Sequence, residues 1–506
     1  MTIKLWGVLG LFLAIAGLLC IPASSVIHGA DETQRSAITG SPPANCSQPV
    51  NKKWIDKVEG IRWVAYSSPD PDPGQGYYQP TAESIYEDLL TLKKANFTGL
   101  ITYGSAGIMG KQFLTIAQSL GYQGIIMGIW NPQGQDEFNN AMNAGSLPIV
   151  LGYSIGNEGL SGTRDRYSIP DLCSAISALR GSTGKPVATS EDIEVYYRRP
   201  EILTTGDWVF PISHPYWHFT KYPLDAIRWE QEQYAALLDR TRRFVFFKEV
   251  GLPTAGAYGL SEANQDLYYR GLAETDVPFA YFEGFDQPSK NTSSVEPHWG
   301  IFHSDLTPKL LGWDLMGYRL FTPDVTSPDR GQGCSKASGQ VCSINPSGTN
   351  LLVGNDLQDR HYSAVLSFNT SGLPDGAVVS SMKLRVRSAG VVGSNPMNNR
   401  HGLAADICTP TPVKTGKGPG VELRAAANCN DNVGIFDRTP NSGWYAVDFL
   451  PSAYPSINLK GTTQFHLRMG DAPKPDASRA YIKFYSGEVD PRGSNSPILL
   501  VKYSLP

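Results

Sequence analysis

Apolar runs alternate with amphipathic stretches from Gly60 to about Leu320. Within residues 83–95, for example, Ile85, Leu89 and Leu92 recur at the spacing of one buried helix face. The apolar runs are short and dense in β-branched and aromatic residues, as buried parallel strands are. Eight of them are Trp63–Tyr66, Leu100–Tyr103, Gly124–Trp130, Ile149–Gly156, Val187–Thr189, Trp208–Ile212, Phe244–Phe247 and Phe279–Phe282.

Strands that alternate with helices in this way predict an α/β fold of the (β/α)8, or TIM barrel, class. A doubly wound open sheet is the alternative, but no Gly-rich phosphate loop follows the first strand. We therefore expect a barrel over residues 56–320.

After Leu320 the pattern changes. Residues 321–347 are rich in Pro, Gly and Ser and predict a linker. Beyond them apolar and polar residues alternate one by one, as in Met382–Arg387 and Phe465–Met469. Such runs, separated by Gly, Asn and Pro turns, predict an antiparallel all-β sandwich over residues 348–506.

The N-terminus has the pattern of an export signal. Lys4 precedes an apolar stretch from Leu5 to Ile21, and small residues follow at 23–25. We expect a signal peptide over residues 1–25, because the stretch is short for a stable membrane anchor. A polar leader is expected over residues 26–55. The mature protein is then expected to be secreted, extracellular or periplasmic.

Six cysteines remain after removal of that signal, and in an exported chain they indicate disulfide bonds. Sequence proximity favours the pairs Cys334–Cys342, Cys408–Cys429 and, by what is left, Cys46–Cys173. Free buried thiols are the alternative, above all for the last pair. The spacing does not resemble a zinc site, and we expect no metal ion and no cofactor.

The composition limits the classes of molecule that the protein is expected to bind. A net charge of −4, with 18% charged residues, gives no sign of electrostatic capture of nucleic acid or of an anionic membrane. The 10 Trp and 24 Tyr offer flat faces on which sugar rings can stack.

Two glutamates stand where strands of the predicted barrel end. Glu158 follows the fourth apolar run and Glu249 follows the seventh. Because barrel active sites form at the C-terminal strand ends, both carboxylates are expected to open into one cleft. A retaining glycosidase needs two such groups roughly 5–5.5 Å apart. We assign Glu158 as acid/base and Glu249 as nucleophile, although either glutamate alone would be read as a solvated loop residue.

The surrounding motifs resemble bacterial and fungal members of glycoside hydrolase family 17, over about residues 60–315. The motifs that carry the resemblance are Gly128–Trp130, Gly156–Glu158, Lys248–Pro253, Ala280–Pro288 with Lys290, and Glu296–Phe302. The resemblance implies a (β/α)8 retaining enzyme that acts on β-1,3-glucan, by hydrolysis or by glucanosyl transfer.

The same resemblance implies roles for individual residues. Glu158 matches the proton donor and Glu249 the nucleophile. Asn157 matches a contact to the sugar 2-hydroxyl, and Tyr216 an aromatic that orients the nucleophile. Glu283 and Lys290 match a supporting charged pair. One departure is Leu252, where many members have Trp, which puts the substrate in doubt more than the mechanism.

Several aromatic residues at strand ends are candidates for stacking on glucose: Tyr66, Tyr103, Trp130, Trp217 and Trp299. About half of such residues are expected to serve packing instead. In the C-terminal domain, Trp444, Tyr445 and Tyr485 are candidate platforms for a carbohydrate or cell-wall surface. A spacer domain is the alternative there.

Two other function classes stay open. Gly152–Gly156 matches the G-x-S-x-G elbow of serine esterases, with Ser154 as nucleophile and Asp286 and His298 in the right chain order. An elbow requires an immediate helix, however, and a loop follows here. The other class is a non-catalytic protein that binds β-glucan or a cell wall.

Overall fold

The computed structural model describes residues 46–505, apart from 70–79, 163, 325–330, 337–340, 346–347, 359, 399–401, 410–428, 442, 470–478 and 488–494. The predicted signal peptide and most of the predicted leader lie outside the described residues. Among the helices that are described, none is long and apolar enough to cross a membrane.

Eight parallel strands form the first sheet, in the order β5-β4-β3-β2-β1-β8-β7-β6. They are β1 (Trp63–Ala65), β2 (Gly99–Ile101), β3 (Gly124–Ile129), β4 (Val150–Ile155), β5 (Val187–Ala188), β6 (Ile212–Ser213), β7 (Phe247–Val250) and β8 (Phe279–Tyr281). Between β5 and β6 the chain makes one parallel bridge, Asp192 with Ile212, and the Ile212 amide donates to the Glu191 carbonyl at 2.9 Å. The expected (β/α)8 fold class is confirmed.

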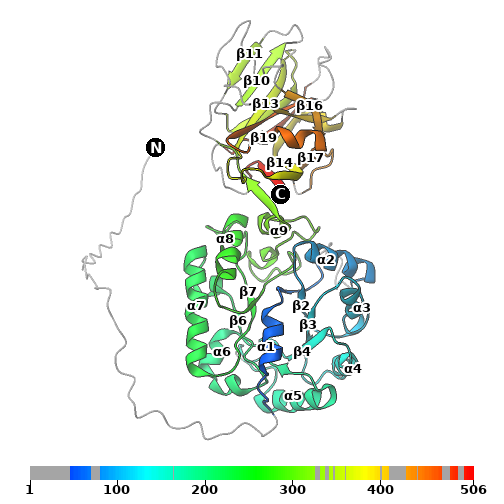
Figure 1. Cartoon of the computed structure of the whole chain (residues 1–506), viewed down its shortest axis with the longest axis vertical. Coiled ribbons are helices and arrows are strands. Elements are labelled where there is room, and N and C mark those ends of the chain that lie inside the picture. The colour runs from blue at the N-terminus through cyan, green and yellow to red at the C-terminus, as the bar shows by residue number, and fades with distance from the viewer. Residues whose placement is uncertain are drawn as a thin grey trace, which may run out of the picture. The chain divides into compact units, whose positions relative to one another are not determined.

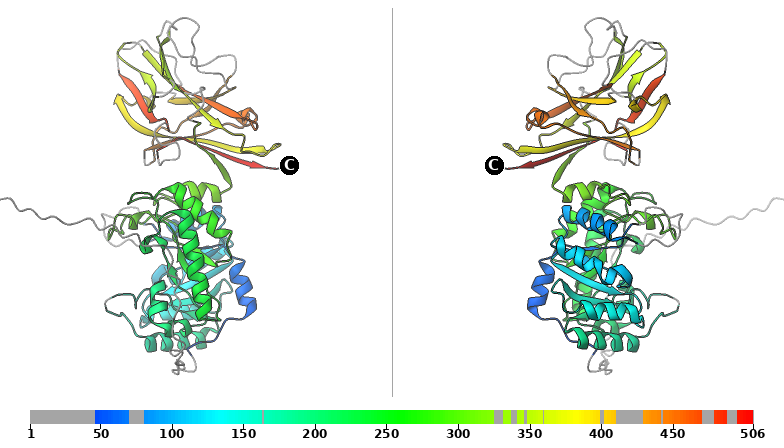
Figure 2. Two further views of the ribbon diagram at one scale, coloured as in Figure 1. Left: turned by 90° about the vertical axis from the view of Figure 1, so that its left-hand side faces the viewer. Right: turned by 90° about the vertical axis from the view of Figure 1, so that its right-hand side faces the viewer.

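Helices surround the strands, as Figure 1 shows. They are α1 (Lys52–Glu59), α2 (Ala82–Lys94), α3 (Gln112–Ser119), α4 (Gln135–Ala144), α5 (Ile169–Thr183), α6 (Ile193–Arg198), α7 (Pro223–Arg240), α8 (Glu262–Ala273) and α9 (Leu310–Leu315), with the 3-10 helices η2 (Gly107–Gly110), η3 (Pro200–Thr204), η4 (Pro215–His218) and η5 (Glu296–His298). The side chain of Thr81 caps α2, and that of Ser168 caps α5, each within a capping box. The long α7 covers one side of the barrel (Figure 2, left).

The sequence places six of the eight strands within about two residues of their observed bounds. The other two, β6 and β7, begin a few residues later than expected. The reason is that Trp208, Phe210 and Phe246 pack into a separate apolar cluster with Trp63. The two segments that precede β6 and β7 share a single bridge, Val209 with Val245, instead of a continuous ladder.

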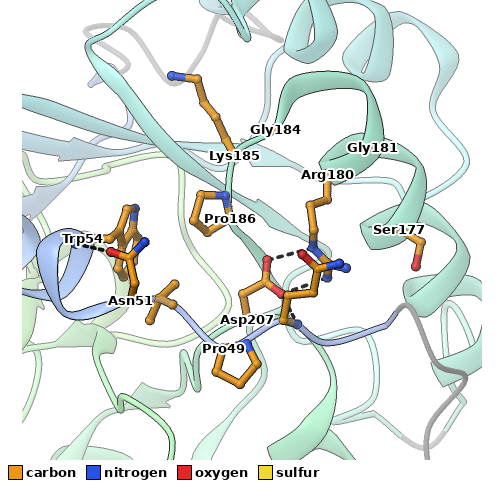
Figure 3. A pocket seen from close by; sticks show the side chains of 12 residues that line it. Pro49, Asn51, Trp54, Ser177, Arg180, Gly181, Gly184, Lys185, Pro186 and Asp207 are labelled. Carbon is orange, nitrogen blue, oxygen red and sulfur yellow. Dashed lines mark hydrogen bonds and ion pairs between the residues drawn. The ribbon is translucent and has the colours of Figure 1, made fainter.

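The segment before α1 is fixed to the opposite end of the barrel from the strands' C-terminal ends. Cys46 is bonded to Cys173 of α5, the pair that remains once the two pairs close in sequence are assigned. Arg180 donates to the Cys46 carbonyl at 3.1 Å and pairs with Asp207 at 2.8 Å. Figure 3 shows this pair in a pocket that Trp54 also lines. Arg180 and Asp207 are paired with each other, and Lys185, which also lines the pocket, donates to the carbonyls of Leu147 and Val150. We therefore interpret this pocket as structural.

The second domain is antiparallel and all-β. Its strands are β9 (Tyr318–Phe321), β10 (Gly331–Lys336), β11 (Val341–Asn345), β12 (Asn350–Asn355), β13 (Arg360–Asn369), β14 (Val378–Gly393), β15 (Leu403–Cys408), β16 (Cys429–Ile435), β17 (Trp444–Asp448), β18 (Thr462–Met469), β19 (Ala480–Tyr485) and β20 (Ile498–Ser504), with η6 (Pro396–Asn398) and η8 (Pro451–Ser456). The long β14 pairs with β17 and β20 along its first part. From Ser388 to Gly393 it pairs with β19, with an irregularity between Ser388 and Gly390.

Alternation in β14 places Met382, Leu384 and Val386 in the core of this domain. Part of the segment 321–347, which its composition predicts to be a linker, pairs with the sheet: β10 lies against β11 and β13. The Cys408–Cys429 bond is confirmed. Cys334 is disulfide-bonded, and the side chain of its expected partner Cys342 lies outside the described residues.

Candidate active site

A cavity of about 510 Å³ lies at the C-terminal ends of the barrel strands. Both glutamates that the sequence singles out, Glu158 and Glu249, line it. The remaining lining residues are Ser67, Tyr103, Trp130, Asn157, Asp192, His214, Trp217, Phe282, Lys290, Glu296 and Trp299. All eight barrel strands therefore contribute to one site, through their C-terminal ends or the connections that follow them.

Glu158 lies three residues beyond the end of β4, on a tightly turned loop. Gly156 and Glu158 both have positive φ, +76° and +51°, which turns the Glu158 side chain toward the cavity. The strain of a left-handed non-Gly residue is held by neighbouring bonds. The Glu158 amide donates to the Ser190 carbonyl at 3.0 Å. The buried Glu191 carboxylate accepts from the amides of Gly159 and Leu160 at 3.2 and 2.9 Å.

Glu249 lies within β7, one residue before the strand ends, and its side chain is only 4% exposed. His214 Nε2 lies 3.4 Å from one of its carboxylate oxygens, and Lys248 Nζ lies 3.3 Å from the other. The His214 ring is itself held between Phe282 and Trp299, each with its ring centroid 4.8 Å away. The two basic groups thus clamp the carboxylate in one orientation.

The environments of the two glutamates drive their pKa values apart. Glu158 is reachable from the cavity, but the surrounding protein removes much of its hydration. That desolvation, together with the negative charge of Glu249, raises the pKa of Glu158 to about 7. Burial also opposes ionisation of Glu249, but Lys248 and His214 outweigh it and lower its pKa to about 2. Near neutral pH the cavity therefore holds one carboxyl that can give up a proton and one that is charged, an arrangement that can support acid-assisted displacement.

Asn157 and Lys248 connect the two glutamates. Lys248 Nζ donates to the Asn157 side-chain oxygen, and the Asn157 amide nitrogen lies 3.4 Å from Glu158. Arg166 donates to the Asn157 carbonyl from the other side and lies 4.5 Å from the Trp130 ring. The loop after β4 is therefore tied to β7 and to the loop after β3.

Most of the other residues expected to bind substrate also reach the cavity. Tyr103, Trp130, Lys290 and Trp299 line it. Glu283 is 1% exposed and accepts from Lys290 at 2.9 Å. Burial raises the pKa of Glu283 to about 7, although Lys290 opposes the shift.

Tyr66 and Tyr216 do not line this cavity in the described part of the chain. Tyr66 is 1% exposed, stacks on Phe113 and donates to Asp88 at 2.9 Å, so it is a packing residue. Tyr216 packs edge-on against Trp217 and Trp299. The ion pairs of Glu249 are with His214 and Lys248, neither of which is assigned a role from the sequence. Tyr103 also faces Glu249.

Signals for both missed residues exist in the sequence. His214 directly follows β6, so the strand-end rule that selects Glu158 also selects it. Lys248 precedes Glu249 inside an apolar run, and a lysine there requires a buried partner. Asp192 and Glu296 also line the cavity. Asp192 lies four residues beyond β5, and Glu296 begins the motif Glu296–Phe302, so the same signals point to both.

Ser154 lies inside β4 and is 2% exposed, whereas an esterase nucleophile requires a sharp turn after a strand. Asp286 pairs with Lys309 at 2.7 Å and with His303 at 3.4 Å. Its carboxylate is thus committed to partners other than His298.

In the described residues no group of three acidic, His or Cys side chains is placed to hold a metal ion.

Two of the three candidate platforms in the all-β domain are buried. Trp444 is 9% exposed and Tyr445 is 2% exposed. The two consecutive side chains point to opposite faces of β17, where Tyr445 packs in the core of the all-β domain and Trp444 packs with Ile498 and Leu500. Tyr485, at the end of β19, is 37% exposed.

Comparison with known proteins places the barrel among carbohydrate-active enzymes. Residues 61–300 match the family model described as the BtgE/BtgC glycoside hydrolase domain. A glucan 1,3-beta-glucosidase of Candida albicans is 26% identical over 264 residues, which are 45% of this chain and 85% of that protein. The match confirms the enzyme class, a glycoside hydrolase, that the carboxylate pair predicts.

Two solved structures are also similar. A glycoside hydrolase family 17 beta-1,3-glucanosyltransferase from Rhizomucor miehei is 22% identical, with a TM-score of 0.42, over 50% of this chain and 97% of that one. An endo-laminarinase from Formosa is 18% identical, with a TM-score of 0.45, over 53% of this chain and 89% of that one.

Replacement of Lys248 by Met should raise the pKa of Glu249 by about one unit or more, because an opposite charge at this range favours the ionised carboxylate. The measurement is an NMR pH titration with carboxyl-labelled glutamate, in which Glu249→Gln identifies the signal. Lys185→Met is the matched control, since Lys185 donates to the carbonyls of Leu147 and Val150, in another part of the barrel. An unchanged titration in Lys248→Met would show that Lys248 does not hold the charge of Glu249.

Proposed function

We propose that this glycoside hydrolase domain is a retaining enzyme that cleaves β-1,3-glucan by double displacement. The observation that carries the proposal is the pair of cavity carboxyls with opposite pKa shifts, Glu158 to about 7 and Glu249 to about 2. The similarity to a glucan 1,3-beta-glucosidase supports β-1,3-glucan as the substrate.

In the first step Glu249 attacks the anomeric carbon and forms a glucosyl-enzyme ester, while Glu158 gives its proton to the departing glycosidic oxygen. Lys248 and His214 keep Glu249 ionised and aimed at the cavity. In the second step Glu158, now a carboxylate, removes a proton from the incoming acceptor, and the acceptor displaces Glu249. Trp299 and Phe282 form part of the wall beside the nucleophile.

Water or a second glucan can serve as that acceptor, and both outcomes use the same two glutamates. We also propose that the protein is exported, which its N-terminal apolar stretch and its disulfide bonds support. A non-catalytic glucan-binding protein would have no need of oppositely tuned carboxyls.

Removal of each glutamate should give a different rescue product. With an aryl β-laminaribioside, azide should restore turnover of Glu249→Ala as the α-glycosyl azide, because azide attacks from the side that the nucleophile vacates. Glu158→Ala should give the β-glycosyl azide, because azide then attacks the glucosyl-enzyme. NMR of the products distinguishes the two anomers. Ser154→Ala is the control and should retain activity. If instead Ser154→Ala is inactive while both glutamate variants keep full activity without azide, the assignment of the two glutamates is wrong.

The pH profile of kcat/KM should be bell-shaped. Activity requires protonated Glu158, so it should fall as pH rises through about 7. It also requires ionised Glu249, so the acid limb should appear only toward a pH of about 2, as far as the fold survives. Initial rates across pH measure both limbs. In Glu158→Gln the limb near 7 should vanish, and its persistence would assign that limb to another group.

The products from defined β-1,3-gluco-oligosaccharides decide between hydrolysis and transfer. We expect cleavage of these substrates, and mass spectrometry of the products gives their lengths. Exclusively shorter products identify a hydrolase, and longer products identify a glucanosyltransferase. If no β-glucan is altered, the proposed function is wrong.

A further inference from the structure

Four aromatic side chains stand in solvent beside the cavity: Trp217, Phe219, Tyr222 and Tyr258, which we call the aromatic ridge. They are 45%, 100%, 51% and 87% exposed. A large apolar side chain stabilises a fold when it is buried, so a fully exposed Phe contributes no such stability. A ridge of this kind on a stable protein commonly marks a binding surface.

The ridge meets the cavity at Trp217. Trp217 belongs to both: it lines the cavity, and its ring centroid lies 6.4 Å from that of Trp299. Phe219 follows directly as the C-cap of η4, and Tyr222 is the N-cap of α7. These residues connect β6 to α7, at the barrel end where the cavity opens.

Lys221 joins the two loops that carry the ridge. Its Nζ donates to the Tyr258 carbonyl at 3.0 Å, in the connection between β7 and α8. The same nitrogen lies 5.8 Å from the Tyr222 ring and 5.5 Å from the Tyr258 ring. The two tyrosines are therefore neighbours in space, although they are far apart in sequence.

The backbone at Phe219 is strained in a way that keeps the ring exposed. Its φ of +63° lies in the left-handed region, where a bulky side chain is unfavourable. Gly would fit this C-cap position without strain. Strain of this kind at a residue that packs against nothing points to a role outside folding.

We propose that the aromatic ridge is a platform for glucosyl residues, which extends the binding cleft beyond the cavity along a β-glucan chain. The inference rests on the proposed function and adds to it a preference for long substrates. A cavity of about 510 Å³ holds only a few sugar rings, so a polymer bound at Glu158 and Glu249 must leave it. Flat aromatic faces receive the C–H faces of β-linked glucose, and Lys221 supplies a donor for its hydroxyls.

The test compares a polymeric with a short substrate. Phe219→Gly and Tyr258→Ala should each raise KM for laminarin about fivefold, which corresponds to the loss of one aromatic contact. KM for laminaritriose and kcat for both substrates should stay unchanged, because the short substrate does not reach the ridge. Tyr86→Ala is the matched control, since Tyr86 is an exposed aromatic on α2, on another side of the barrel (Figure 1).

Phe219→Gly separates binding from stability. Gly relieves the left-handed strain, so this variant should have a Tm equal to or above that of the unmodified protein while it binds laminarin more weakly. A lower Tm together with an unchanged laminarin KM would assign Phe219 to the fold and overturn the inference.

Other outcomes also decide. If the unmodified protein cleaves both substrates and the ridge variants alter KM equally for laminarin and laminaritriose, or not at all, only the ridge inference is overturned. The same holds if the variants lose affinity for phosphatidylcholine vesicles but not for laminarin, because the ridge is then a membrane surface. If the unmodified protein cleaves neither glucan, the proposed function and the inference fall together.

Discussion

The contact between Lys248 and Glu249 inside the mouth of the barrel is the constraint on which the site depends. Removing two charged groups from water costs free energy, and a buried ion pair is stable only where each group has further polar partners. Glu249 has His214 as its second partner, and Lys248 has Asn157. Because Asn157 precedes Glu158, the group that fixes the charge on one carboxyl also fixes the backbone that presents the other.

The tuning of Glu158 follows in part from this arrangement. Burial is the larger cause of the raised pKa of Glu158, and repulsion by the negative charge of Glu249 adds to it, so the proton stays on Glu158. Were Glu249 neutral, that repulsion would disappear. The two glutamates are thus chemically distinct although they are the same residue type, and the difference originates in which of them lies against the lysine.

The sequence is most informative where one local rule suffices. Apolar runs locate the strands, and the strand-end rule selects Glu158 and Glu249. It is least informative where side-chain direction decides: Tyr66 stands at a strand end but turns inward to Asp88, and Trp444 and Tyr445 are buried. Composition also suggests a linker where β10 and β11 pair, because Gly and Ser reduce strand propensity but do not prevent pairing with an existing sheet. Such outcomes depend on contacts between residues distant in the chain.

The junction between β5 and β6, which we call the seam, has a consequence for local opening of the barrel. Elsewhere in the barrel, neighbouring strands pair over at least two residues, whereas this seam has one parallel bridge and the bond from Ile212 to Glu191. Segments with few backbone bonds are where proteins open locally first. On one side of the seam, Glu191 accepts hydrogen bonds from the loop that carries Glu158. On the other side, His214 directly follows β6. Local opening of the barrel at this point would therefore move the loop of Glu158 away from His214 and Glu249, so that the stiffness of a single seam sets how long the two carboxyls face each other.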